Sequence, residues 1–399
     1  MSTATALRGI GRPLDDQTEL GRALDELLDA HGEPTLLGLG EPAHGVAAFP
    51  LLRNDILTHL VRRGFRSIAL ETDIFAAALV DDYVNGASAD LDTVLATGFS
   101  HGFGAIPANR DLVEWLREYN AGRAPRDRVR FHGFDAPVEF ASAPSPREAL
   151  TAVHDHLPEA MRPESARALD ALLGADSDWS DPAAMFDPAA SVGDSSRAHL
   201  LRRVAEDLAS ALRRAAPGLY TADPAAYTRA AAHARAAQGL LRYHAAMARG
   251  GPDRIAHLLS HRADMMAENL LALVARERHR GPTLVFAHNI LLQRQLPADA
   301  QPCCSAGAFV DLALGDRYLF LATDAGLAPA PGTLQAALSE ATVRRTLFPT
   351  PALRDALPPT QSAAEPIVRG HIPLTPTDLA RADALVFLTD TDGSQHQYW

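Results

Sequence analysis

The chain has 399 residues, 47% of them hydrophobic, and its 37 basic and 49 acidic residues leave a net charge of -12. That acidic balance disfavours nucleic-acid phosphate and anionic membranes as partners, and it favours a neutral or cationic small-molecule substrate. Because a single hydrophobic core stops growing at roughly 250 to 300 residues, a helical accessory region is expected beside the main core.

Strand and helix signals alternate along the first third of the chain. Apolar runs predict strands near residues 35–40, 66–71 and 129–134, and amphipathic stretches predict helices near residues 49–63, 73–85 and 109–120. Such alternation is typical of right-handed βαβ units and of a mainly parallel sheet.

The pattern changes from about residue 145 to residue 280, where Ala, Leu and Arg dominate with helical spacing. Breaks at Pro and Gly, including Pro217 and Gly218, predict four to six helices there. Strand character then returns at residues 283–287, 318–322 and 384–388. The predicted fold class is α/β, with a mainly parallel sheet flanked by helices and an inserted helical region.

This pattern also predicts a domain organisation. The expected parts are an N-terminal segment (1–34), an α/β catalytic core (35–144 and 281–399) and a helical insertion covering the active-site cleft (145–280).

Four of the apolar runs end directly in an ionisable side chain. These residues are Glu41, Glu71, Asp135 and His288. Buried strands of a parallel sheet are near-continuous apolar runs, and ligands bind beyond their carboxyl ends. We therefore expect one active site at this edge of the sheet, although each residue taken alone could simply begin a loop.

Glu41 precedes His44 by three residues, in Glu41-Pro42-Ala43-His44-Gly45. In a helical turn the two side chains would share a face. A carboxylate beside an imidazole fixes its tautomer and raises its basicity, so His44 is the candidate general base for activating water. The alternative is a helix-capping Glu41 and a solvent-exposed His44.

Arg53 falls inside the apolar stripe of the helix expected at residues 49–63. A guanidinium there needs a carboxylate or a ligand oxygen as partner, although its stem could instead lie along an apolar surface with the head in water. Asp135 is a candidate to support the pocket or to make a structural turn. Arg262 and Asn269, in the inserted helices, are candidates to face the cleft.

No cofactor is expected. Two Glu and two His could ligate a divalent ion, but they come from separate segments and form no His-Glu-x-x-His motif, so no metal is predicted. Neither a Gly-x-Gly-x-x-Gly nor a Walker A motif follows a strand, and no Gly-x-Ser-x-Gly elbow is present. Cys303 and Cys304 are adjacent, which suits neither a disulfide nor a thiolate metal site. The chain has no lysine, so a Schiff-base mechanism is excluded.

Several segments, taken together and in order, resemble the erythromycin esterase family. They are Gly40-Glu41-Pro42-Ala43-His44-Gly45 with Phe49 and Leu52-Arg53, Ala69-Leu70-Glu71, Trp115-Leu116-Arg117-Glu118-Tyr119-Asn120, Gly133-Phe134-Asp135, Arg262 with Met266-Ala267-Glu268-Asn269, and Ala287-His288-Asn289. The resemblance covers roughly residues 35 to 390.

What the resemblance implies is an α/β core with helical additions and hydrolysis of the macrolactone ester of macrolides. The counterpart of His44 is thought to activate water there, with the residues matching Glu41, Arg53, Glu71 and His288 lining the cleft. The candidate substrate-binding residues are Asp135, Arg262, Asn269 and Asn289.

This chain also departs from the family pattern. Relatives commonly carry acidic residues where it has Ala47-Ala48, Ala108-Asn109 and Ala263. The resemblance therefore implies a retained reaction centre with an altered substrate site.

The predicted activity is hydrolysis of an ester or lactone of a natural product or antibiotic by water that His44 activates. Glu41 or Glu71 would orient the base, and Arg53 or His288 would stabilise the oxyanion. The alternative is a biosynthetic tailoring enzyme that uses the same base for cyclisation or group transfer. The first 20 residues lack a signal-peptide pattern and no apolar run is long enough to span a membrane, so a cytoplasmic location is expected. The oligomeric state stays open.

Overall fold

The computed structural model describes residues 3–139, 142–294, 305–358 and 361–398, so Cys303 and Cys304 lie outside the described residues. The chain forms two compact units. The first is built from the chain up to Phe134, the segment that begins at Leu270 and the segment from Ser305 onward, and the second from Asp135–Asn269. The chain thus enters the helical unit earlier, and leaves it earlier, than the predicted boundaries of 145 and 280.

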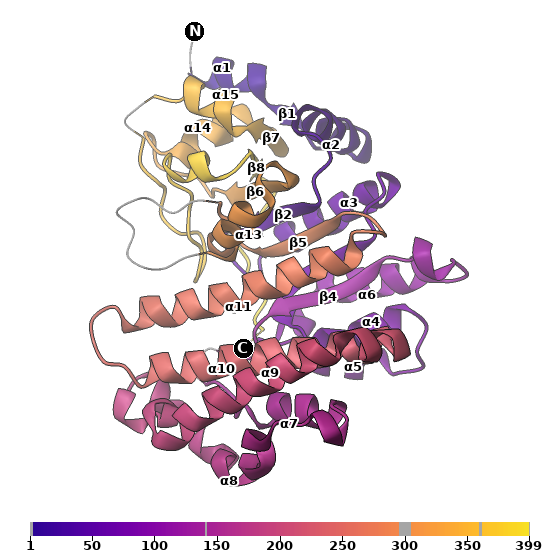
Figure 1. The fold of residues 1–399 in the computed structure, drawn as a ribbon. Coiled ribbons are helices and arrows are strands. Elements are labelled where there is room, and N and C mark those ends of the chain that lie inside the picture. Colours follow the sequence, from indigo (N-terminus) through magenta and orange to yellow (C-terminus); the bar gives the residue numbers. More distant parts are fainter. Residues whose placement is uncertain (1–2, 140–141, 295–304, 359–360, 399) are drawn as a thin grey trace. The chain divides into compact units, whose positions relative to one another are not determined.

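The first unit contains a mostly parallel sheet, which confirms the predicted α/β class. Within the described residues it has eight strands in the order β1-β7-β8-β6-β2-β5-β3-β4. The strands are β1 (Arg12–Pro13), β2 (Leu36–Glu41), β3 (Ser67–Asp73), β4 (Arg130–Asp135), β5 (Thr283–His288), β6 (Tyr318–Ala325), β7 (Arg345–Pro349) and β8 (Ala384–Leu388). Figure 1 shows that strands from both ends of the chain lie side by side, with the indigo β2 between the orange β5 and β6.

The register of the central strands fixes which residues share the carboxyl edge of the sheet. Strand β2 pairs in parallel with both β5 and β6, and Glu41 stands opposite His288. Strand β3 pairs in parallel with the other side of β5, with Leu70 opposite Phe286. Every residue of β2 and β5 is buried, as expected for strands inside a parallel sheet.

Helices accompany the strands of this unit. They are α1 (Thr3–Ile10), α2 (Gln17–His31), α3 (Ala48–Arg62), α4 (Ala76–Val84), α5 (Leu91–Thr97), α6 (Pro107–Asn120), α12 (Asn289–Leu292), α13 (Ala306–Leu314), α14 (Leu334–Ala341) and α15 (Thr350–Ala356). Helix α6 begins at Pro107, whose fixed φ suits the first helical position. Helix α4 begins later than predicted because β3 runs on to Asp73, whose carboxylate accepts hydrogen bonds from the N–H groups of Phe75 and Ala76.

The second unit is helical. Among the described residues, its α-helices are α7 (Arg147–His156), α8 (Leu169–Leu173), α9 (Ser196–Ala222) and α10 (Pro224–Met247). Helix α11 (Arg254–Glu277) belongs to this unit up to Asn269. Helices α9 and α10 lie along each other (Figure 1). The predicted break at Pro217 is wrong, since α9 continues to Ala222. The chain breaks instead at Asp223, which caps α10 by accepting from Ala225 and Ala226 N–H.

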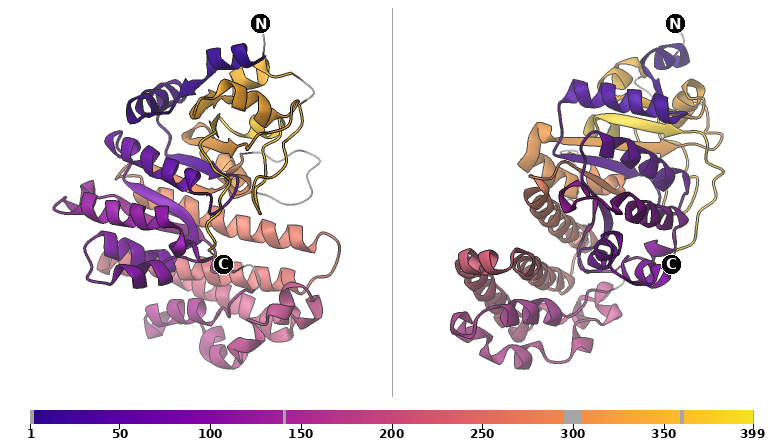
Figure 2. Two further views of the ribbon diagram at one scale, coloured as in Figure 1. Left: turned by 180° about the vertical axis from the view of Figure 1, so that it is seen from behind. Right: turned by 90° about the vertical axis from the view of Figure 1, so that its right-hand side faces the viewer.

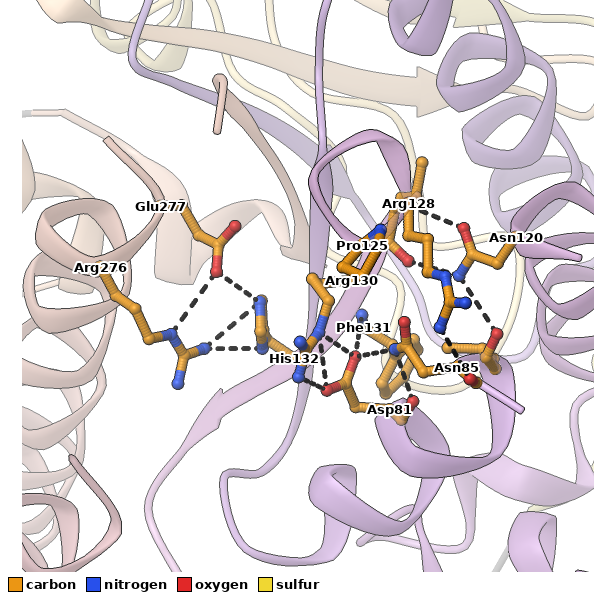
Figure 3. Close-up of polar contacts among 12 residues, drawn as sticks. Asp81, Asn85, Asn120, Pro125, Arg128, Arg130, Phe131, His132, Arg276 and Glu277 are labelled. Atoms are coloured by element: carbon orange, nitrogen blue, oxygen red, sulfur yellow. Dashed lines mark hydrogen bonds and ion pairs between the residues drawn. The ribbon is translucent and has the colours of Figure 1, made fainter. Parts of the chain in front are cut away.

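A buried polar network holds the edge strand β4 of the first unit to its neighbours (Figure 3). Asp81 of α4 accepts two hydrogen bonds of 2.9 Å from Arg130 Nε. Glu277, at the end of α11, lies 3.4 Å from His132 Nε2 and 3.5 Å from Arg276 Nε. Burial alone would raise the pKa of Glu277, but these partners lower it to about 2. The carboxylate is therefore ionised at neutral pH, and it anchors the end of α11 against β4.

None of the described helices combines the length and the hydropathy needed to cross a bilayer.

Candidate active site

Three of the predicted site residues converge at the carboxyl edge of the sheet. Glu41 and His288 are the last residues of β2 and β5, and Glu71 lies near the end of β3. The backbone N–H of His288 donates to Glu71 Oε2 at 3.0 Å. The two carboxylates therefore flank the end of β5, which lies between their strands.

Glu41 forms a hydrogen-bonded pair with His44. The imidazole lies in the turn after β2, and its Nδ1 is 2.8 Å from Glu41 Oε1. Because the carboxylate accepts, Nδ1 carries the proton, and the neutral imidazole keeps its lone pair on Nε2. That Nε2 lies 3.8 Å from Glu71 Oε2. The His44 side chain is 17% exposed, so the basic nitrogen is held in a shielded position between two carboxylates.

The environment of Glu41 raises the pKa of its carboxyl group. Burial is the largest cause, and it outweighs the lowering by the hydrogen bond to His44 and by the charges of His44 and Arg53. A more basic carboxylate is a stronger acceptor for the Nδ1 proton. It can therefore stabilise an imidazolium that forms on His44.

The His288 imidazole is neutral at physiological pH. Burial, followed by the nearby charge of His44, lowers its pKa to about 4. Its Nε2 donates to the carbonyl of Pro42 at 2.9 Å, and its Nδ1 accepts from Ile290 N–H at 3.3 Å. The His288 and His44 rings meet edge to face, with centroids 5.4 Å apart. With both nitrogens engaged, His288 is placed to hold the loop that carries His44.

Arg53, on α3, lies beneath the site with 1% of its surface exposed. Its guanidinium donates to Asn109 Oδ1 at 2.7 Å, to the Ala108 carbonyl at 3.1 Å and to Asn54 Oδ1 at 3.0 Å. It also lies over the Phe286 ring, 4.9 Å from the centroid. All these partners are uncharged, and burial lowers the pKa of Arg53 to about 9. The site thus contains a buried cation that has neutral hydrogen-bond partners.

A small cavity is lined by Arg53 and by Glu41 and Glu71. Its volume is about 20 Å³, which is roughly the room that one water molecule requires. Its other lining residues are Asn109 and the apolar residues Pro50, Leu70, Phe99, Phe103, Ile106, Phe286 and Ala287.

Asn289, which follows His288, has a nearly inaccessible side chain that is 1% exposed. Its amide donates to the Thr323 carbonyl at 2.8 Å and accepts from Thr323 N–H at 3.2 Å. A Cβ at Gly40 would lie 2.0 Å from Asn289 Oδ1, so glycine is needed there. This placement supports a role in joining β5 to β6 beneath the site.

The remaining predicted residues belong to the helical unit. Arg262 forms a bidentate ion pair with the fully buried Asp135. Its Nε donates to Asp135 Oδ1 at 3.0 Å, and its Nη2 donates to Asp135 Oδ2. Asn269 is also buried, with 9% of its surface exposed. Substrate contact by these residues stays a prediction.

Sequence reasoning missed three features around the site. The rings of Phe103 and Tyr398 lie 4.8 Å and 6.2 Å from the His44 ring, measured between centroids. Asp324, fully buried near the end of β6, accepts from His371 Nε2 at 3.0 Å. A signal existed for Asp324, because it follows the apolar run of residues 318–322 after the single residue Thr323. No local signal marks the two aromatic residues.

Among the described residues, no group of three or more His, Cys, Asp or Glu side chains is arranged to hold a metal ion.

Comparison with known proteins identifies the family. The erythromycin esterase family profile matches residues 60–363, a span that includes Glu71 and His288 and begins after His44. No curated protein matches the chain.

Solved structures share the fold. A Bacillus cereus protein superposes with a TM-score of 0.74 at 18% identity, over 99% of this chain and 98% of that one. A succinoglycan biosynthesis protein gives 0.70 at 15% identity over 98% and 96%. A mutant of erythromycin esterase EreC in its open conformation gives 0.68 at 19% identity over 95% of both chains. The profile match covers most of the chain, which therefore belongs to the erythromycin esterase family, a membership that supports a hydrolase-like function on a small molecule.

Proposed function

We propose that this protein hydrolyses a carboxylic ester or lactone of a natural product or antibiotic, with water activated by His44. The observation that carries the proposal is the Glu41–His44 pair. It commits Nδ1 as a donor to Glu41 Oε1 at 2.8 Å and leaves Nε2 as the base, 3.8 Å from Glu71 Oε2. A carboxylate, an imidazole and a bound water in line form a general-base system.

The reaction follows from this arrangement. Water held by Nε2 and the Glu71 carboxylate loses a proton to Nε2 as its oxygen attacks the ester carbonyl carbon. Glu41 stabilises the imidazolium that forms. When the tetrahedral intermediate collapses, Nε2 returns the proton to the leaving alkoxide, which departs as an alcohol and leaves the acid. No covalent enzyme intermediate is required.

Arg53 supplies positive potential in this scheme. Its described N–H contacts are to neutral oxygens at 2.7 to 3.1 Å, so the cation acts through its field on the carboxylates and on the developing oxyanion. A charge acts over a longer range in a buried, low-dielectric site than in water. We assign His288 to positioning, because both of its ring nitrogens bind backbone groups.

The partner of Arg53 is relevant to substrate choice. Asn109 Oδ1 accepts from Arg53 at 2.7 Å, and the family resemblance implies an acidic residue at Ala108-Asn109. The neutral amide adds no negative charge beside the guanidinium, on which the carboxylates of Glu41 and Asp111 act, so the cation can stabilise negative charge that develops on a substrate near it. The site chemistry is thus retained while its electrostatics differ from the family pattern.

The test is product analysis in water enriched in ¹⁸O. The purified protein is incubated with macrolide lactones and a panel of simpler esters and lactones, and the masses of the products are measured by mass spectrometry. Hydrolysis adds one water and places one ¹⁸O in the carboxylate. A product formed without added water would instead support cyclisation or group transfer by the same base.

Two variants make the assignment specific. His44→Asn should abolish the ¹⁸O incorporation. His199→Asn, at a surface histidine whose side chain is 55% exposed, should leave it unchanged.

A further inference from the structure

We infer that the segment from Gln395 to Tyr398 holds the turn that carries His44 through contacts of Gln395, His396 and Tyr398, and that Tyr398 is a positioning residue for the imidazole of His44. The inference rests on the proposed function of His44 as the general base. It concerns what keeps that base in its reactive orientation.

Backbone contacts fix this segment to the turn that carries His44. The side-chain amide of Gln395 donates to the His44 carbonyl at 2.8 Å and to the Arg369 carbonyl at 2.9 Å. The N–H of His396 donates to the Gly45 carbonyl at 2.7 Å. Figure 2 shows this end of the chain beside the indigo and purple segments of the first unit. Consecutive carbonyls of the catalytic turn are thus held from a distant part of the chain.

Two glycines are required where the segment docks. Gly45 has φ +78° and a Cβ there would lie 2.5 Å from the His396 carbonyl oxygen, while Gly102 has φ +71° and a Cβ there would lie 1.8 Å from the Tyr398 carbonyl oxygen. Any other residue would therefore meet both an unfavourable backbone conformation and a steric clash. The turns at Gly45 and Gly102 are shaped to receive this segment.

The rings complete an aromatic enclosure around His44. Tyr398 meets the imidazole at 88° with centroids 6.2 Å apart, and it meets Phe103 at 71° and 5.1 Å. Phe103 in turn lies 4.8 Å from the imidazole, and His288 lies 5.4 Å from it. Edge-to-face contacts of this kind are favourable and directional. The imidazole is therefore held so that Nδ1 stays on Glu41 while Nε2 faces Glu71.

The chemistry of the phenol is compatible with this role. Burial and the charges of Glu41 and Glu71 raise the pKa of Tyr398, so the ring stays neutral while His44 works. The contacts that carry the inference are those of the ring, which phenylalanine would preserve. Leucine would remove the aromatic edge.

The first experiment measures exposure of His44 without an activity assay. Wild type, Tyr398→Phe, Tyr398→Leu and Gln395→Ala are treated with diethyl pyrocarbonate, and carbethoxylation of His44 is followed by peptide mass spectrometry. The exposed residue His199 is the internal reference, and Gln397→Ala, at an exposed neighbour in the same segment, is the matched control.

We expect Tyr398→Leu to raise the His44 modification rate several-fold, Gln395→Ala to raise it less, and Tyr398→Phe and Gln397→Ala to leave it unchanged. A wild-type rate in both Tyr398→Leu and Gln395→Ala would overturn the inference. This outcome is independent of whether an ester substrate is cleaved, so failure of the proposed function and failure of the positioning role are distinguishable.

The second experiment uses an ester that the wild type cleaves. Misplacing a catalytic group by about 1 Å can cost up to 10²-fold in rate, and we expect Tyr398→Leu to lower kcat by ~10-fold with a smaller change in KM. Tyr398→Phe should rescue kcat to nearly the wild-type value. If Tyr398→Phe were as damaging as Tyr398→Leu, the hydroxyl would be the functional group and ring positioning would be wrong.

Discussion

Glu41 and His288 stand opposite each other at the ends of the paired parallel strands β2 and β5, and they hold the same loop from two sides. Glu41 accepts the Nδ1 proton of His44, and His288 donates to the carbonyl of Pro42, two residues earlier in that loop. Strand register thus places the turn that carries His44, since a shift of either strand would separate one of the two residues from its partner.

Replacing His44 by Asn should lower kcat by ~10²-fold or more, the usual contribution of a general base. The melting temperature should change little, because the amide N–H group of Asn can replace Nδ1 as the hydrogen-bond donor to Glu41. Steady-state kinetics and a thermal melt on the same preparation provide the check. Wild-type turnover with an unchanged melting temperature would show that the imidazole is a bystander.

The neutral state of His288 predicts a pH-dependent stability. Its pKa falls from 6.5 to about 4 on folding, so between these values the unfolded chain binds a proton that the folded protein does not. The contribution of His288 to the free energy of unfolding is therefore constant above pH 6.5. It falls as the pH drops toward 4, by up to ~3 kcal/mol.

The variant His288→Gln isolates this effect because its amide can donate but does not titrate. Urea unfolding is measured at pH 7.5, 5.5 and 4.5. As the pH falls, the free energy of unfolding should decrease more for the wild type than for His288→Gln. A difference that is constant with pH would contradict a neutral, buried His288.

Asp324 is predicted to support the site from behind. It accepts from His371 Nε2 at 3.0 Å and from Leu374 N–H at 3.0 Å, and the backbone N–H of Ile372, between them, donates to the Pro42 carbonyl at 2.9 Å. Both oxygens of this buried carboxylate accept hydrogen bonds, Oδ1 from Ala325 N–H and His371, and Oδ2 from Gln335 and Leu374 N–H. An Asn side chain would set an amide N–H group against one pair of donors, and an unsatisfied buried polar group costs about 1–3 kcal/mol, so Asp324→Asn should be markedly less stable. It should also lower kcat.

Chemical denaturation and kinetics measure both effects of Asp324→Asn. The matched control is Asp316→Asn at an exposed position in the 3-10 helix Gly315–Arg317, which should behave as wild type. Equal stability of Asp324→Asn and Asp316→Asn would show that the buried pair is not required.

Activity is predicted to survive chelation. Glu41 already binds the Nδ1 proton of His44, Glu71 accepts the N–H of His288, and both His288 nitrogens bind backbone groups. The protein is dialysed against a strong chelator, then assayed and submitted to elemental analysis. Loss of one equivalent of metal together with activity, with both restored by adding it back, would reassign His44, Glu71 and His288 as metal ligands.

Much of the α/β fold follows from the sequence, because buried parallel strands are continuous apolar runs. The predicted strands at residues 35–40 and 283–287 differ from β2 and β5 by about one residue at their ends. Strand β7 was not predicted, because Arg345 and Pro349 enclose only three residues of strand character and the strand runs antiparallel to β8. Its neighbours in the sheet, which the local sequence does not contain, decide its conformation.

The candidate site was less predictable from sequence. Parallel strand ends meet at one edge, which is why Glu41, Glu71 and His288 could be placed together in advance. Tyr398 and Phe103 reach His44 only through the tertiary fold, and no spacing rule links residues so far apart. The helical turn expected between Glu41 and His44 is a non-helical turn, yet the two side chains still meet.

The position of β5 between β2 and β3 has a consequence for synthesis. The ribosome releases β2 and β3 well before β5, which follows the whole helical unit in the chain. Until β5 emerges, the facing edges of β2 and β3 have no partner strand, and unpaired edges of this kind invite association between nascent chains. The helices of Asp135–Asn269 can fold during that interval. The candidate site therefore begins to assemble only when β5 closes the gap and brings His288 to Glu41, and the contacts of Gln395 and Tyr398 with the turn of His44 follow at the end of the chain.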